Sequence, residues 1–100
     1  MKELAEQVME HAKICDVTIV TAESCTAGAL AHLLSQTPGA GDYLEGGFVT
    51  YTKDMKNDAL GVSMKLLKAK SAVCEEVAKA MAIGALKRSP ADVAIAITGV

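Results

Sequence analysis

Aromatic residues are scarce in this chain and basic residues form no stripe, and together these absences exclude several classes of protein. The 100 residues include no Trp, one Phe and two Tyr, and the net charge is −2 at pH 7. Without a basic stripe or a set of stacking aromatic rings, we expect no direct binding of nucleic acid. No apolar run is long enough for a membrane span, and the polar N-terminal segment is unlike a signal peptide. We therefore expect a cytoplasmic protein with no membrane partner.

The cysteines form neither a disulfide framework nor a metal-binding pattern. Cys15, Cys25 and Cys74 are odd in number, widely spaced and without a CxxC pair. Three free thiols in a reducing compartment are the simplest interpretation. Although Cys25 follows a serine, we expect it to be a small buried side chain rather than a nucleophile. His11 has no partner at ligand spacing, so we expect neither a metal nor another cofactor.

The sequence does contain alternating helical and strand-like patterns, in a chain of the length of one domain. Half of its residues are apolar, and most of these are aliphatic. The order helix, strand, helix, strand, helix, helix, strand predicts a layered α/β sandwich. The last strand is an uninterrupted apolar run, which predicts a central position with both faces covered. We expect helices near residues 2–13, 25–36, 52–60, 64–67 and 74–87, and strands near residues 18–21, 48–51 and 93–98.

Ser24 is the first candidate for chemistry, because it lies where a strand pattern passes into a helix pattern. There its hydroxyl would project from a rigid strand end, near the positive end of a helix dipole. That position favours either a nucleophile or a site for an anion. The alternative is a plain N-cap, since serine is among the best capping residues. Neither the capping box nor the glycine-flanked elbow of hydrolases is present, as Ala22, Thr26 and Ala27 occupy the positions that would define them.

Glycines at two places in the chain predict close approach to the backbone or an irregular backbone path. Gly28 falls in the predicted second helix, where a glycine suggests the close approach of a neighbour or a ligand. The pair Gly46 and Gly47 precedes the second strand and predicts a bulge or a close contact of the backbone.

Five segments, in the same order, resemble the C-terminal domain family of the competence/damage-inducible protein CinA, which includes stand-alone nicotinamide mononucleotide amidohydrolases. The resemblance covers nearly all of residues 1–100 and implies one domain with a three-layer α/β/α sandwich. Residues 21–28 resemble TAESCTGG, residues 38–47 resemble PGS…F-x-GG, residues 51–62 resemble YSNEAK…LGV, residues 72–78 resemble AVSEEVA, and residues 97–100 resemble the start of TGIAGP.

The chain departs from these motifs at three positions. Ala27 replaces the first glycine of the GG pair, Lys53 replaces an asparagine, and Cys74 replaces the serine that would cap the long helix. The chain also stops at Val100, just after a strand, so we expect the domain to be truncated at its C-terminal side. The glycine-rich loop, later strands and final helix of the family lie beyond these residues.

The resemblance implies the deamidation of nicotinamide mononucleotide to nicotinate mononucleotide and ammonia, in the pyridine nucleotide cycle. Ser24 would be the nucleophile and Lys56 its general base, in a Ser-Lys dyad that needs no metal. Lysine acts as a base only where burial or nearby charge lowers its pKa. By its pattern alone, Lys56 would instead be a solvated lysine on a helix.

The other site residues also follow from the resemblance. Tyr51 and Thr98 match positions at the catalytic site, where each alternatively only finishes a strand. Cys25 would supply an oxyanion-binding N–H, and Thr26 belongs to the same substrate-binding set. Gly46 and Gly47 are candidates for contact with the substrate phosphate.

A binding or regulatory module without turnover is the alternative function, and family members are named for competence and DNA damage. The only partner that the resemblance implies is the small-molecule substrate. A homo-oligomer is also plausible, because a thin α/β layer leaves apolar surface to cover.

Overall fold

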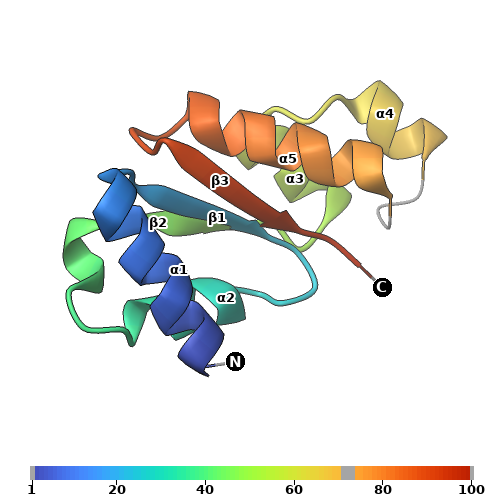
Figure 1. Cartoon of the computed structure of the whole chain (residues 1–100). Helices are drawn as coiled ribbons and strands as arrows, with labels where there is room; N and C mark the ends of the chain where they lie inside the picture. Colours follow the sequence, from blue (N-terminus) through green and yellow to red (C-terminus); the bar gives the residue numbers. More distant parts are fainter. Residues whose placement is uncertain (1, 71–73, 100) are drawn as a thin grey trace.

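The chain folds into three layers, with a parallel sheet between two sets of helices (Figure 1). The computed structural model describes residues 2–70 and 74–99. Residues 72, 73 and 100, which carry part of two of the family motifs, lie outside the described residues. The elements in chain order are α1 (Lys2–Cys15), β1 (Ile19–Glu23), α2 (Ala29–Ser35), the 3₁₀ turn η1 (Ala40–Asp42), β2 (Leu44–Val49), α3 (Lys53–Leu60), α4 (Met64–Ala69), α5 (Glu75–Lys87) and β3 (Val93–Ile97).

The two faces of the sheet have separate cores, which follow from the alternation of side chains along β1. Ile19 faces α1 and α2 and packs with Met9 and Leu34. Val20 and Ala22 face the other side and pack against α5 and the α3–α4 segment. Because neighbouring residues of a strand point to opposite faces, β1 is buried along its whole length. The three-layer α/β/α class predicted above is confirmed.

The strand order is β2-β1-β3, so β1 is the central strand. Both of its neighbours run parallel to it, with Glu23 opposite Val49 on one side and Ile97 on the other. The prediction of a central last strand is wrong for the described residues, because β3 pairs with β1 alone and is partly exposed. An apolar run indicates that both faces of a strand are packed against other elements. It does not indicate whether the strand is hydrogen-bonded on one edge or on both.

The second strand begins earlier and ends earlier than the sequence predicts. It spans Leu44–Val49 rather than residues 48–51, so both glycines lie inside it. The predicted irregularity is confirmed, because the pairing register shifts between Ile19–Leu44 and Val20–Gly46. The predicted close contact is confirmed as well, since a Cβ on Gly47 would overlap Thr21 Oγ1 and crowd Ala31.

A turn occupies residues 24–28, where the sequence predicts the first turn of a helix. The helix α2 begins only at Ala29, and its N-cap position is Gly28. Both Ala27 (φ 50°) and Gly28 (φ 99°) have left-handed backbone conformations, and this interrupts the helical path. The left-handed region is unfavourable for alanine by about 1 kcal/mol or more, which gives a physical reason for glycine in the family motif at this position.

The helix boundaries on the other side of the sheet follow the sequence closely. Thr52 caps α3 through Met55 N, and Gly61 ends it with a φ of 68°. Ser63 caps α4 through Leu66 N, and Cys74 occupies the N-cap of α5 without a side-chain capping bond. These local signals act within one turn of helix, so the sequence alone is enough to place them.

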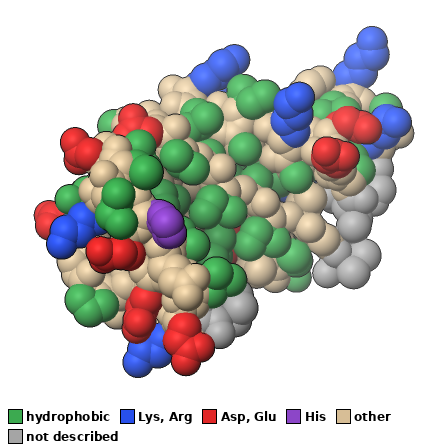
Figure 2. Space-filling model, viewed as in Figure 1, with side chains coloured by type: hydrophobic (Ala, Val, Ile, Leu, Met, Phe, Trp, Pro, Cys, Tyr) green, Lys and Arg blue, Asp and Glu red, His purple; other side chains and the backbone are tan. Residues whose placement is uncertain are grey.

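None of the described helices has the length and apolar character that crossing a bilayer requires. On the face shown in Figure 2, charged side chains lie mostly around the rim. Hydrophobic and uncharged side chains occupy the middle of that face, where Figure 1 shows β3 crossing the molecule.

Candidate active site

The Ser24 hydroxyl and the Lys56 amine meet at the carboxyl end of β1. Lys56 Nζ lies 2.8 Å from Ser24 Oγ, although the two residues are 32 positions apart in the chain. Ser24 follows β1, held by a bond from its N–H to Ile97 O at 2.9 Å. Lys56 lies in the second turn of α3, which follows β2, the neighbour of β1. The parallel pairing of β1 and β2 therefore brings both groups to the same edge of the sheet.

Lys56 is buried, contrary to what its sequence pattern alone predicts. Only 1 % of its surface is exposed. Its Nζ also donates to the carbonyl oxygens of Thr50 at 2.9 Å and Tyr51 at 3.4 Å. A neutral amine has two N–H donors and one lone pair. These two carbonyls can take both donors, which leaves the lone pair for the hydroxyl proton of Ser24.

The surroundings of Lys56 favour its neutral form. Burial lowers the pKa of Lys56 below the ordinary value of 10.5; nearby Cys25 opposes this shift, and the positive charge of Lys53 adds to it. No carboxylate in residues 2–70 and 74–99 lies within ion-pair distance of the Lys56 amine. The one ion pair in this part of the chain joins Lys70 and Glu76. Desolvation without a counter-ion is the physical condition under which a lysine becomes a base near neutral pH.

Ser24 does not cap α2. Its side chain is buried, and its Oγ lies near Lys56 Nζ and 3.5 Å from Tyr51 O. The capping alternative is thus wrong, because the turn at residues 24–28 moves the start of the helix beyond the reach of Ser24.

Cys25 has an exposed side chain, so the prediction of a buried thiol is wrong. The residue belongs to the turn and not to a helix face, which points it out of the core. Within the part of the chain that the structure describes, its N–H has no hydrogen-bond partner. All three cysteines are free thiols, as predicted. A free N–H directly after a nucleophile suits the stabilisation of an oxyanion.

Tyr51 contacts Ser24 and Lys56 directly, and Thr98 is connected to them through its neighbour Ile97. The Tyr51 carbonyl oxygen accepts from Lys56 Nζ at 3.4 Å and from Ser24 Oγ at 3.5 Å, while the residue is 67 % exposed. Thr98 follows Ile97, whose carbonyl accepts the bond from Ser24 N. A shallow hollow of about 410 Å³ lies beside this strand end, between β3 and the start of α5, and includes Thr98 in its wall. The structure therefore joins Tyr51 to Ser24 and Lys56 by hydrogen bonds, and it places Thr98 one residue after the carbonyl that holds Ser24 N.

The glycines Gly46 and Gly47 are not brought to the dyad. They pair with Val20 and Thr21, three or more positions before Ser24 along β1. At about 3.3 Å per residue, that separation is on the order of 10 Å. Close packing of Gly47 against Thr21 accounts for a glycine there, and its contact with substrate stays a prediction.

Glu23 is a residue of the site that sequence reasoning missed. Its carboxylate is fully buried and accepts four hydrogen bonds, which include one from Thr26 Oγ1 at 2.7 Å. Burial raises the pKa of Glu23, but the bonds from Thr26, from the N–H groups of Leu30 and Ala31, and from Thr21 together outweigh it and lower the pKa. The available signal was an acidic residue at the end of an otherwise apolar strand.

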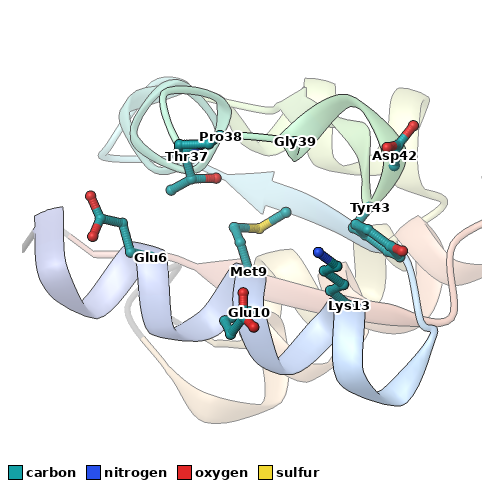
Figure 3. A pocket seen from close by; sticks show the side chains of 9 residues that line it. All are labelled: Glu6, Met9, Glu10, Lys13, Thr37, Pro38, Gly39, Asp42 and Tyr43. Carbon is teal, nitrogen blue, oxygen red and sulfur yellow. The ribbon is translucent and has the colours of Figure 1, made fainter.

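A separate cavity of about 440 Å³ lies between α1 and residues 37–43 (Figure 3). Neither Ser24 nor Lys56 lines it, and Tyr43 in its wall accepts a bond from Ile19 N at the opposite end of β1. Glu6, Glu10 and Asp42 face it together with Lys13. No group of three or more His, Cys, Asp or Glu among the described side chains is arranged to hold a metal.

Comparison with known proteins assigns the chain to a family. The model of the CinA C-terminal domain matches residues 1–100. The chain belongs to the CinA C-terminal domain family. A CinA-like protein of Mycolicibacterium gilvum is 55 % identical over 83 residues, which are 83 % of this chain and 20 % of that protein. A putative competence-damage inducible protein of Symbiobacterium thermophilum is 51 % identical over 84 residues, 84 % of this chain and 20 % of that protein.

Solved structures of CinA proteins have the same fold. The competence/damage inducible protein CihA of Agrobacterium tumefaciens superposes with a TM-score of 0.95 at 41 % identity, over 99 % of this chain and 60 % of that one. A CinA superfamily protein of Escherichia coli superposes with a TM-score of 0.95 at 41 % identity, over 98 % of this chain and 57 % of that one. The chain thus spans about a fifth of the length of the curated relatives it matches and about three fifths of these solved chains.

Proposed function

We propose that this CinA domain is an amidohydrolase that converts nicotinamide mononucleotide to nicotinate mononucleotide and ammonia in pyridine nucleotide salvage. The observation that carries the proposal is the buried Lys56 Nζ, 2.8 Å from Ser24 Oγ. A serine attacks an amide only when a base takes its proton, and a lysine is such a base only when its pKa is lowered. Family membership supports the choice of substrate, since the CinA resemblance includes nicotinamide mononucleotide amidohydrolases.

In the acylation step, the Ser24 oxygen attacks the carboxamide carbon while its proton passes to Lys56 Nζ. The amide oxygen becomes an oxyanion, and the free N–H of Cys25 is the donor within this turn that would bind it. The tetrahedral intermediate then collapses to an ester on Ser24. The amide nitrogen leaves as ammonia and takes the proton that Lys56 holds, so the amine returns to its neutral form.

In the deacylation step, a water molecule replaces ammonia in the same geometry. Lys56 takes a proton from the water as its oxygen attacks the ester carbon. The intermediate collapses, the proton returns to Ser24 Oγ, and nicotinate mononucleotide is released. Lys56 therefore acts as base and then as acid in each of the two steps, which fits an amine whose burial favours the neutral form that begins each step.

The surroundings of the dyad support an aromatic amide substrate. Tyr51, whose carbonyl oxygen accepts from Lys56 Nζ, is exposed. A hollow lined by Ile97 and Thr98 lies at the strand end whose carbonyl accepts from Ser24 N. We propose that Tyr51 and Thr98 orient the carboxamide, while Gly46 and Gly47 stay predicted contacts of the substrate. The Thr26 hydroxyl donates to Glu23 instead. Residues beyond the matched three fifths of the solved relatives are expected to complete the nucleotide site.

The decisive experiment measures ammonia and nicotinate mononucleotide formed by the protein at its full natural length. Ser24→Ala and Lys56→Ala are each expected to reduce kcat/KM about 1,000-fold or more, because the two groups act as one unit. Ser35→Ala and Lys65→Ala are matched controls on exposed positions of α2 and α4, and both are expected to keep wild-type turnover.

Two outcomes would contradict the proposal. Unchanged turnover in Ser24→Ala or Lys56→Ala would refute the dyad. If the wild-type protein releases no ammonia but still binds the nucleotide, the alternative of a non-catalytic binding or regulatory module takes its place.

A further inference from the structure

Glu23 is the one buried carboxylate among residues 2–70 and 74–99, and it has no cation beside it. It is 0 % exposed, and no Lys, Arg or His of the described chain lies within ion-pair distance. Burying an ionised carboxylate is costly unless hydrogen bonds replace the lost water. A carboxylate placed in this way, directly before the candidate nucleophile, requires a structural or functional reason.

Four donors surround this carboxylate and divide evenly between its two oxygens. Oε1 accepts from Thr26 Oγ1 at 2.7 Å and from Leu30 N at 2.9 Å. Oε2 accepts from Thr21 Oγ1 at 3.0 Å and from Ala31 N at 3.0 Å. The N-cap position of α2 is a glycine without a side chain, so Glu23 satisfies free amides of this helix from seven or eight positions earlier.

The turn at residues 24–28 is closed into a loop by these bonds. Its first end is fixed by β1, where Thr50 N donates to Glu23 O at 2.8 Å and Ser24 N donates to Ile97 O at 2.9 Å. Its second end is fixed by the Glu23 side chain, through Thr26 and the first turn of α2. Left-handed Ala27 lies inside the loop and is unfavourable for a non-glycine residue, so the shape must be held by its surroundings.

We propose that Glu23 is a positioning residue for the candidate nucleophile: its carboxylate fixes the turn in which the Ser24 hydroxyl meets Lys56 and the Cys25 N–H stays free. This inference rests on the proposed function, because it assigns Glu23 a task in the same reaction. Ser24 and Glu23 are neighbours that face opposite sides of the sheet, so Glu23 acts through the backbone and touches no reacting atom.

The requirement is for a carboxylate and not merely for a polar group of its size. In Glu23→Gln, one of the two oxygens becomes an NH₂ group. Whichever way the amide is turned, this NH₂ faces either Leu30 N–H or Ala31 N–H, and neither backbone donor can rotate away. Two donors then oppose each other in a buried place, and the turn must shift to relieve them.

Steady-state kinetics of the full natural chain with nicotinamide mononucleotide test the proposal. We expect Glu23→Gln to lower kcat about 100-fold with KM within about twofold of the wild type, since a shift of about 1 Å misaligns the attack but leaves binding intact. Glu45→Gln is the matched control, because it makes the same change on an exposed residue of β2 and should leave both constants unchanged. Wild-type kcat in folded Glu23→Gln, or a rise in KM alone, would overturn the proposal.

Thr26→Val provides a second variant in case Glu23→Gln does not fold, because it removes one of the four bonds and keeps the shape of the side chain. If Thr26 acts through Glu23, kcat should fall about tenfold, KM should hold, and the double variant should be no worse than Glu23→Gln. A rise in KM with unchanged kcat would make Thr26 a substrate contact and would count against the proposal.

Labelling of Ser24 by a fluorophosphonate separates this inference from the proposed substrate. The Ser24 oxygen bonds to phosphorus, fluoride leaves, and the hydroxyl proton passes to Lys56. If the wild type labels but does not deamidate, the proposed function fails, and Glu23 is judged by an expected labelling rate about 100-fold slower in Glu23→Gln. If the wild type neither labels nor deamidates, there is no nucleophile to position and both proposals fall.

Discussion

At the scale of single residues, the charge of Lys56 decides what the site can do. The amine is buried, bonded to two carbonyl oxygens and adjacent to a serine hydroxyl. An ammonium in this position would have three acceptors and no counter-ion within the described chain. The neutral amine has one lone pair free to accept the hydroxyl proton, and burial favours this neutral form by lowering the pKa of Lys56.

We predict that kcat/KM rises with pH and levels off at an apparent pKa below 10.5, because only the neutral amine accepts the Ser24 proton. Lys53→Gln should move this pKa upward, since the charge of Lys53 lowers it. Cys25→Ala should move it downward, since Cys25 raises it. Rates measured across pH on all three proteins check these directions, and identical profiles would contradict the assignment of Lys56 as base.

At the scale of secondary-structure elements, α3 is held in place by a close crossing with α5. Gly84 of α5 lies against the end of α3, where a Cβ on it would collide with the carbonyl oxygen of Leu60. Leu60 is one turn after Lys56 in the same helix. The absence of one side chain on α5 therefore sets the depth at which α3, and with it the amine, sits on the sheet.

We predict that Gly84→Ala destabilises the protein by about 2 kcal/mol, a typical cost of overpacking a buried contact. It should also reduce turnover, because the helix that carries Lys56 must move outward. Gly41→Ala is the matched control, as nothing lies within 4 Å of a Cβ there and its φ is not in the left-handed region. Urea denaturation measures both variants, and equal stability would show that α3 does not depend on this crossing.

At the scale of the whole molecule, the sheet separates two buried ionisable groups at the end of one strand. Glu23 faces the layer of α1 and α2, and Lys56 approaches Ser24 from the layer of α3 to α5. Both pKa values are lowered in the folded state, so each group in its deprotonated form favours folding. At each of these two groups the folded state binds fewer protons than the unfolded chain over the pH interval between the folded-state pKa and the unfolded-state pKa. The free energy of unfolding therefore rises with pH across each interval.

We predict that the stabilisation due to Glu23 is fully present above pH 4.5 and is lost as the pH falls through its lowered folded-state pKa. Glu23→Gln should be less stable than the wild type at pH 7 by about 2 kcal/mol, since it leaves buried donors unsatisfied. The difference should narrow toward acid pH. Denaturation series at several pH values check this, with Glu45→Gln as the exposed control; a difference that does not change with pH would contradict it.

Much of this architecture is determined by local sequence. Capping residues such as Thr52 and Ser63, the stop at Gly61 and the β-branched run at the start of β1 act through neighbours within one turn or one strand. These signals are enough to predict the α-helices, the strands and the layered α/β class, although the bounds of α2 and β2 differ and η1 is not predicted. The family motifs then identify Ser24 and Lys56 as partners before any distance is known.

Only the tertiary structure decides the environment of those residues. The burial of Lys56 follows from how α3 packs on the sheet, and its sequence pattern favours a solvated position. The edge position of β3 likewise depends on elements far apart in the chain. The sequence by itself determines which residues form helices and strands, because propensity and capping are local. The packing of the layers decides which side chains are removed from water and brought into contact, since burial and pKa values arise from contacts between distant segments.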